Sequence, residues 1–134
     1  MPKRTPSRKG CYLKRSEFEG LVRGAVESLP EELKDRLDNV AILIEENPPD
    51  FDSSEDESGQ NLLGLYHGIS MKDRGFWYGN VLPDQIIIYR KPLERISLNF
   101  QELKENIRQT VVHEVGHYFG LDEEELRRLE EGGY

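Results

Sequence analysis

The chain has 134 residues, a single cysteine and a net charge of −8 at pH 7. This length suits one domain, and the lone Cys11 excludes an internal disulfide. No apolar run approaches the roughly 20 residues of a membrane-spanning helix, and the N-terminus lacks the apolar stretch of a signal peptide. We therefore expect a soluble, cytoplasmic protein, to which a free thiol is suited.

Charge divides the chain into two unequal parts. Residues 1–15 hold six Lys or Arg and no acid, so the other 119 residues carry a net charge of −14. We expect residues 1–15 to be a basic, disordered arm and residues 16–134 to be the folded domain. Because the acidic domain repels phosphates, nucleic acid is not expected as its partner.

The first third of the domain reads as two helices. Ser16 and Glu19 fit a capping box, and apolar residues follow at helical spacing as far as Leu29. Pro30 ends that helix, and its acidic successors predict a second, short helix over residues 31–37.

Three segments then have the character of strands. Residues 40–44 and 62–69 are apolar and rich in branched side chains, and residues 84–90 give the strongest strand pattern. Between them, residues 50–59 are acidic and Ser-rich, which predicts a loop. Residues 71–83 contain two glycines and a proline, which predicts a loop or a loose hairpin.

The C-terminal third is predicted to be helical. A short turn over residues 92–97 precedes a long helix that starts at Asn99, has Glu102 at the capping-box position and ends at Gly120. Residues 122–131 form the last expected helix. Helices, strands and again helices, in this order, predict an α+β fold with a small sheet.

The long helix carries an HExxH motif at residues 113–117. His113 and His117 are four residues apart, so they project from one helix face and can bind one Zn²⁺. Glu114 can hold a water on that metal and accept its proton. The alternative is two surface histidines beside an ordinary acid. Gly116 indicates either close packing or room for another segment near the metal.

A catalytic zinc needs a third protein ligand. Gly120 lets the chain turn back after the helix, and Glu123 follows three residues later, so Glu123 is the expected ligand. Asp122 or Glu124 could take its place. Glu123 could instead pair with Arg127 at i+4 on the surface.

Several stretches together resemble a small bacterial family, the minimal or acidic zincin-like metallopeptidases. Residues 113–123 follow its HExxHxxGxx(D/E) pattern, residues 82–84 read Leu-Pro-Asp, and the resemblance extends over residues 16–131. It implies a zincin-like fold, with a small mixed sheet backed by helices and the HExxH helix below the edge strand, near the C-terminus. It also implies a metal site made by His113, Glu114, His117 and the acid at position 123.

The chain departs from the larger zincins in two respects. Metzincins place a methionine turn below the metal, whereas the only methionines here are Met1 and Met71. Gluzincins bring a glutamate ligand from a later helix, for which Glu130 and Glu131 are the only late candidates.

Side chains outside the motif carry weaker signals. His67 and Tyr78 are candidates for contacting the substrate or the transition state, as are Tyr66 and Tyr89, although tyrosines more often serve packing. The aromatic segment Gly-Phe-Trp-Tyr-Gly at residues 75–79 would form a lip of the substrate cleft or a hairpin that covers the core.

These observations predict a hydrolase that cleaves a peptide or protein substrate with one Zn²⁺ per chain and Glu114 as general base. Two alternatives stay open: a zincin-fold module that binds metal or regulates without turnover, and another metal hydrolase. Among the latter, a small endoribonuclease with an HxxxHxxxxxH site would lack Glu114 and would need a basic groove.

Overall fold

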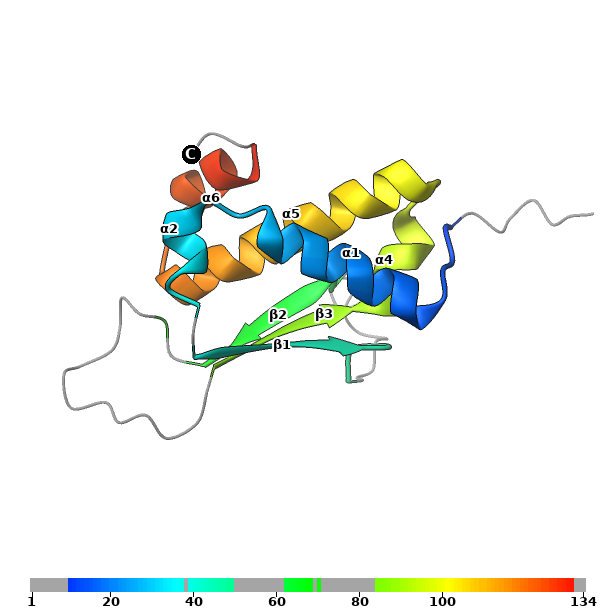
Figure 1. The fold of residues 1–134 in the computed structure, drawn as a ribbon, viewed down its shortest axis with the longest axis horizontal. Helices are drawn as coiled ribbons and strands as arrows, with labels where there is room; N and C mark the ends of the chain where they lie inside the picture. Colours follow the sequence, from blue (N-terminus) through cyan, green and yellow to red (C-terminus); the bar gives the residue numbers. More distant parts are fainter. Residues whose placement is uncertain (1–9, 38, 50–61, 69, 71–83, 132–134) are drawn as a thin grey trace, which may run out of the picture.

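The computed structural model describes residues 10–37, 39–49, 62–68, 70 and 84–131, which form helices and a sheet (Figure 1). In chain order the elements are α1 (Arg15–Glu27), α2 (Glu31–Lys34), β1 (Val40–Glu45), β2 (Gly64–His67), β3 (Asp84–Tyr89), α4 (Arg90–Ile96), α5 (Phe100–Phe119) and α6 (Glu123–Glu130). No helix in these described ranges is both long enough and apolar enough to cross a membrane.

The sheet is mixed, with strand order β1-β3-β2. β1 runs parallel to β3, with Ile42 opposite Ile86. β2 runs antiparallel to β3, with Tyr66 opposite Ile86, and it forms one edge of the sheet. The predicted α+β fold with a small mixed sheet is confirmed.

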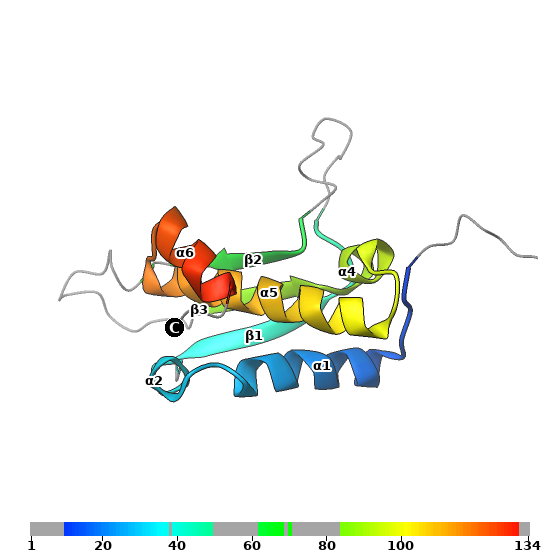
Figure 2. The same cartoon turned by 90° about the horizontal axis from the view of Figure 1, so that it is seen from above.

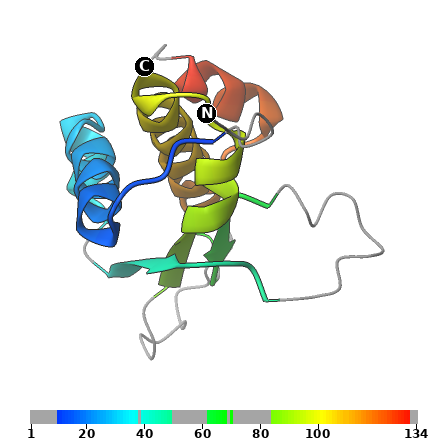
Figure 3. The same cartoon turned by 90° about the vertical axis from the view of Figure 1, so that its right-hand side faces the viewer.

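The helices cover one face of this sheet. Figure 3 shows α1 and α5 side by side above the strands, and Figure 2 shows α6 on the side of α5 that faces away from α1. The layer between helices and sheet is the core, and burial there stabilises the fold by about 1.5–3 kcal/mol for each large apolar side chain. Fully buried core members are Phe18, Ile86, Ile88, Leu93, Leu103, Ile107, Val111 and Val115.

The helix α5 begins and ends as predicted, and α6 is one residue shorter at each end than the predicted 122–131. Asn99 caps α5 by accepting a hydrogen bond from the Glu102 N–H at 2.8 Å, and Gly120 ends the helix in the left-handed conformation with φ 79°. Asp122 and Glu125 form the capping box of α6, with both bonds at 2.8 Å. These caps fix the turn that folds α6 back toward α5.

The predicted start of α1 is wrong. The helix begins at Arg15 with Lys14 as its N-cap, and Ser16 lies inside it. The Glu17 carboxylate accepts a hydrogen bond from the Lys14 N–H at 3.1 Å, while Glu19 is bound by the Arg15 guanidinium. A carboxylate two residues earlier than expected therefore provides the capping interaction.

The segment just before α1 lies against α4. The Leu13 N–H donates to the buried Glu94 carboxylate at 3.2 Å, and Arg90 donates to the Leu13 carbonyl at 2.8 Å. Residues 1–9 of the expected arm lie outside the described residues, so the division of the chain at residue 15 stays a prediction.

Candidate metal centre

The HExxH motif lies in the last two turns of α5, next to the edge strand β2. His113 and His117 are partly exposed, whereas Glu114 is buried, with 8% of its surface accessible. The helix thus turns two imidazoles toward solvent and one carboxylate toward the sheet.

The two imidazoles converge through the same ring atom. His117 Nε2 lies 3.1 Å from His113 Nε2, and the rings meet edge to face with centroids 4.7 Å apart. Two nitrogens bound to one tetrahedral zinc at about 2.0–2.1 Å are separated by about 3.3–3.4 Å. The same separation also suits one N–H···N hydrogen bond in the absence of metal. The histidine pair therefore fits a zinc ion with only a small adjustment.

The surroundings of His117 favour its neutral form. Burial lowers the pKa of His117, and the nearby His113 lowers it further, against smaller opposing effects of Glu123 and Glu130. A neutral imidazole is the form that binds a metal. The local electrostatics therefore keep His117 ready to act as a ligand near neutral pH.

Burial raises the pKa of Glu114. His113 and a hydrogen bond from the Tyr66 backbone lower the pKa, and Glu130 raises it slightly. A carboxylate whose pKa is moved toward neutrality is a better proton acceptor than an exposed one. Glu114 therefore has the burial and the position that a general base needs.

A cleft runs between α5 and β2 over these three residues, in two connected parts of about 320 and 370 Å³. Both parts share Leu62, Gly64, His113 and Glu114. One extends along α5 past Asn106, Gln109 and Thr110 to Glu130. The other extends past Leu65 and Tyr66 to His117.

Gly64 allows β2 to lie directly against α5. A Cβ atom there would lie 2.7 Å from Thr110 Cγ2, 3.1 Å from the Ile87 carbonyl oxygen and 3.3 Å from Glu114 Cγ. Two side chains of α5 and a backbone oxygen of β3 leave no room for a methyl group at this point. A glycine at the first residue of β2 is therefore what brings the sheet edge over the general base.

The backbone of β2 presents some of its polar groups to the cleft side. The Tyr89 N–H donates to the Leu63 carbonyl at 2.9 Å, so hydrogen-bonded pairs with β3 fall on odd-numbered residues of this stretch. The main-chain groups of Gly64 and Tyr66 consequently point away from β3. The hydrogen bond from the Tyr66 backbone to Glu114 agrees with this direction.

Gly116 serves close packing, the first of its two predicted roles. A Cβ atom there would lie 2.1 Å from Leu126 Cδ2, and Leu126 is a buried residue of α6. The Leu121 N–H donates to the Gly116 carbonyl at 3.0 Å and closes the turn between the helices. The missing side chain lets α6 lie on the motif helix.

Glu123 lies close to the histidines without joining them. It is the first residue of α6 and is exposed, and its charge raises the pKa of His117. Among the described residues, no three His, Cys, Asp or Glu side chains form a group that could hold a metal. The alternative pair of Glu123 with Arg127 is also not formed within these residues. The role of Glu123 stays a prediction.

Glu130 contacts the motif, an interaction that sequence spacing did not identify. Its carboxylate Oε2 accepts a hydrogen bond from His113 Nδ1. The two residues are 17 positions apart and the chain reverses between them, so no helical or strand periodicity connects the two. The one local feature that marks Glu130 in the sequence is its place in the last turn of a predicted helix, where the macrodipole disfavours a negative charge.

Of the candidates for contacts with the substrate or the transition state, those that the structure describes lie at different distances from the cleft. His67 ends β2, is exposed and lines neither part of the cleft. Tyr66 lines the cleft, with its hydroxyl donating to Asp84 at 2.6 Å. Tyr89 is buried. Tyr78 and the aromatic segment at residues 75–79 lie outside the described residues.

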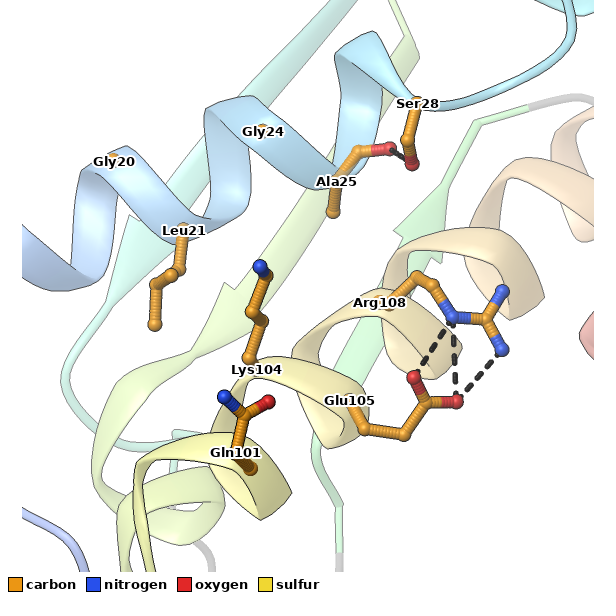
Figure 4. Close-up of a pocket in the computed structure, with 9 residues that line it drawn as sticks. All are labelled: Gly20, Leu21, Gly24, Ala25, Ser28, Gln101, Lys104, Glu105 and Arg108. Atoms are coloured by element: carbon orange, nitrogen blue, oxygen red, sulfur yellow. Dashed lines mark hydrogen bonds and ion pairs between the residues drawn. The ribbon is translucent and has the colours of Figure 1, made fainter.

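A second groove, of about 650 Å³, lies between α1 and α5 (Figure 4). The residues that α1 contributes to it include Gly20 and Gly24, where an added Cβ would meet nothing within 4 Å. Its carboxylate, Glu105, is bound by Arg108 at 2.8 Å. The residues that line this groove include no histidine or cysteine, so they offer no imidazole or thiolate ligand for a metal.

Comparison with known families agrees with this geometry. Residues 37–133 match the family described as zincin-like metallopeptidase, and the chain belongs to that family. A comparison with curated proteins gave no match.

The tight contact at Gly64 gives a testable prediction. Gly64→Ala should lower the free energy of unfolding by about 1–3 kcal/mol, because the methyl group overpacks the contact with Thr110. Thr110→Ser removes Cγ2 and should recover part of that loss in the double variant. Chemical denaturation measures both effects.

Gly24→Ala is the matched control, because an added methyl group meets open space there. It should raise stability by up to about 1 kcal/mol through helix propensity. Equal responses at positions 24 and 64 would show that Gly64 is not required for the close approach.

Proposed function

We propose that this zincin-like metallopeptidase hydrolyses peptide bonds with one zinc ion, which His113 and His117 bind, and with Glu114 as the general base. The arrangement in the cleft carries the proposal. Two imidazole Nε2 atoms lie 3.1 Å apart, and the buried carboxylate of the adjacent residue faces the sheet edge. Surface histidines beside an ordinary acid would not require burial of that acid.

Each residue then has a defined task. Zinc, when bound, supplies a water whose pKa is lowered to about 7 and polarises the substrate carbonyl. Glu114 takes the proton from that water and later delivers it to the leaving amine. The raised pKa of Glu114 brings the two proton transfers closer in energy near neutral pH.

The edge strand supplies a place for the substrate backbone. Among the described residues β2 pairs with one strand, β3, and the main-chain groups of Gly64 face away from it. An extended peptide can add to such an edge through backbone hydrogen bonds. The histidines lie along the same cleft, so a peptide bound there would pass over the metal ligands.

We further propose that Glu123 completes the metal site. It starts α6 directly after the turn at Gly120, and its charge already acts on His117. A rotation of this exposed side chain toward the two imidazoles would provide the third protein ligand that catalytic zinc requires.

The first prediction concerns metal content. Purified protein should hold one zinc ion per chain, and His113→Ala or His117→Ala should each lose it, because each removes a ligand. Elemental analysis after zinc loading measures the stoichiometry. His67→Ala is the matched control and should keep the metal. Wild-type protein that takes up no zinc would refute the metal site.

The second prediction separates metal binding from turnover. Glu114→Gln should keep zinc and the fold but lose cleavage of a peptide library by at least about 100-fold, because only the proton acceptor is removed. Full activity of Glu114→Gln would contradict the general-base role. Zinc-loaded wild type that cleaves no peptide would favour the alternative, a metal-binding module without turnover.

The third prediction identifies the remaining ligand. Glu123→Ala should weaken zinc binding by orders of magnitude, because it removes a direct ligand. Arg127→Ala, the matched control one turn further along α6, should leave zinc affinity unchanged. Competition with a chromogenic chelator gives both affinities. Equal zinc affinity of wild type and Glu123→Ala would place the third ligand elsewhere.

A further inference from the structure

We infer that Glu130 is a positioning residue, which orients the His113 ring so that its Nε2 faces the metal. The inference rests on the proposed metal site and adds a residue to it.

The two nitrogens of His113 have separate partners. Nε2 faces His117 Nε2 at 3.1 Å, and Nδ1 is hydrogen-bonded to the Glu130 carboxylate. A carboxylate only accepts, so Nδ1 carries the proton in this bond. The lone pair of the neutral ring then lies on Nε2, the atom that faces His117. Glu130 thus selects the tautomer that can bind a metal between the two histidines.

The same bond sets the direction of the ring. A histidine side chain rotates about two bonds, and a partner on one nitrogen fixes where the other nitrogen points. His113 is more than a third exposed, so packing alone leaves its ring less restricted than a buried one. The bond to Glu130 holds the ring with Nε2 directed into the cleft.

Glu130 itself lies on the wrong side of the ring to be a ligand. Its carboxylate binds Nδ1, whereas the metal position lies between the Nε2 atoms. Glu123, at the other end of α6, forms no hydrogen bond with His113 within the described residues, and the charges of both acids act on His117. The two ends of one short helix therefore serve the site in different ways.

The position of Glu130 is fixed by contacts on both sides of the helix. Arg108 donates from Nη2 to the Glu130 carbonyl at 2.9 Å and is itself held by Glu105 at 2.8 Å. Leu126 and Leu129 of α6 are buried, and Leu126 packs at Gly116. These contacts anchor the end of α6 to α5 and deliver the carboxylate to His113.

Stability of α6 does not account for this residue. A negative charge in the last turn of a helix opposes the macrodipole. Glu131, the next residue, is also acidic and is exposed. Within the described residues it makes no bond with the motif. Glu131 is therefore a matched control, with the same side chain at the same helix end.

Zinc affinity, measured by chelator competition, tests the inference. Glu130→Ala should bind zinc about 10- to 100-fold more weakly, the usual effect of losing the outer partner of a ligating histidine. Glu130→Gln should lose less, because the amide oxygen can still accept the Nδ1–H bond. Glu131→Ala should match wild type.

Nitrogen NMR of the zinc-loaded protein gives a second readout. Wild type should show the His113 ring protonated at Nδ1, with that proton protected from exchange with water. In Glu130→Ala the proton should exchange rapidly, and in Glu131→Ala it should remain protected. A change in general stability alone would not produce this difference at one ring.

Three outcomes would overturn the inference. If Glu130→Ala binds zinc as tightly as wild type, Glu130 does not position the ligand, although the metal site stands. If Glu130→Ala loses zinc as completely as His113→Ala, Glu130 is a ligand and not a positioning residue. If wild type binds no zinc, the proposed function fails together with this inference, and that result is distinct from the first two.

Discussion

Close packing around α5 is the constraint on which the candidate site depends. This helix contacts α1 on one side, the sheet below it and α6 on the other side. Two glycines permit the tightest of these contacts, Gly64 toward β2 and Gly116 toward α6. A methyl group at either position would separate α5 from a neighbour, and the site is built from both of those neighbours.

This packing sets the electrostatics as well as the shape. β2 lies close enough to bury Glu114, which raises its pKa, and at the same distance the Tyr66 backbone offers that carboxylate a hydrogen bond. Burial without any such partner would disfavour the ionised form of the carboxylate further. The strand edge thus makes the Glu114 carboxylate more basic by burying it, and its backbone hydrogen bond reduces the cost of that burial. An exposed glutamate on the same helix would have neither property.

The sequence predicted the parts of the site that have local signals. Asn99 and Gly120 are caps, whose chemistry acts within four residues, and each lies where it was predicted. The HExxH spacing placed two histidines on one helix face, and the Nε2 contact agrees with it. The start of α1 was predicted wrongly because several acids near Ser16 compete for one cap, and only the surrounding contacts decide among them.

The part that could not be predicted is tertiary, and Glu130 illustrates the reason. Its contact with His113 depends on three features at once. These are the left-handed turn at Gly120, the lack of a side chain at Gly116 and the hydrogen bond from Arg108 to the Glu130 carbonyl. Each is a weak or ambiguous signal by itself. Together they fold a short helix back along α5, so that the acid in its last turn reaches His113 Nδ1. The fold therefore gives chemically equivalent carboxylates different surroundings, as the buried Glu114 and the hydrogen-bonded Glu130 illustrate.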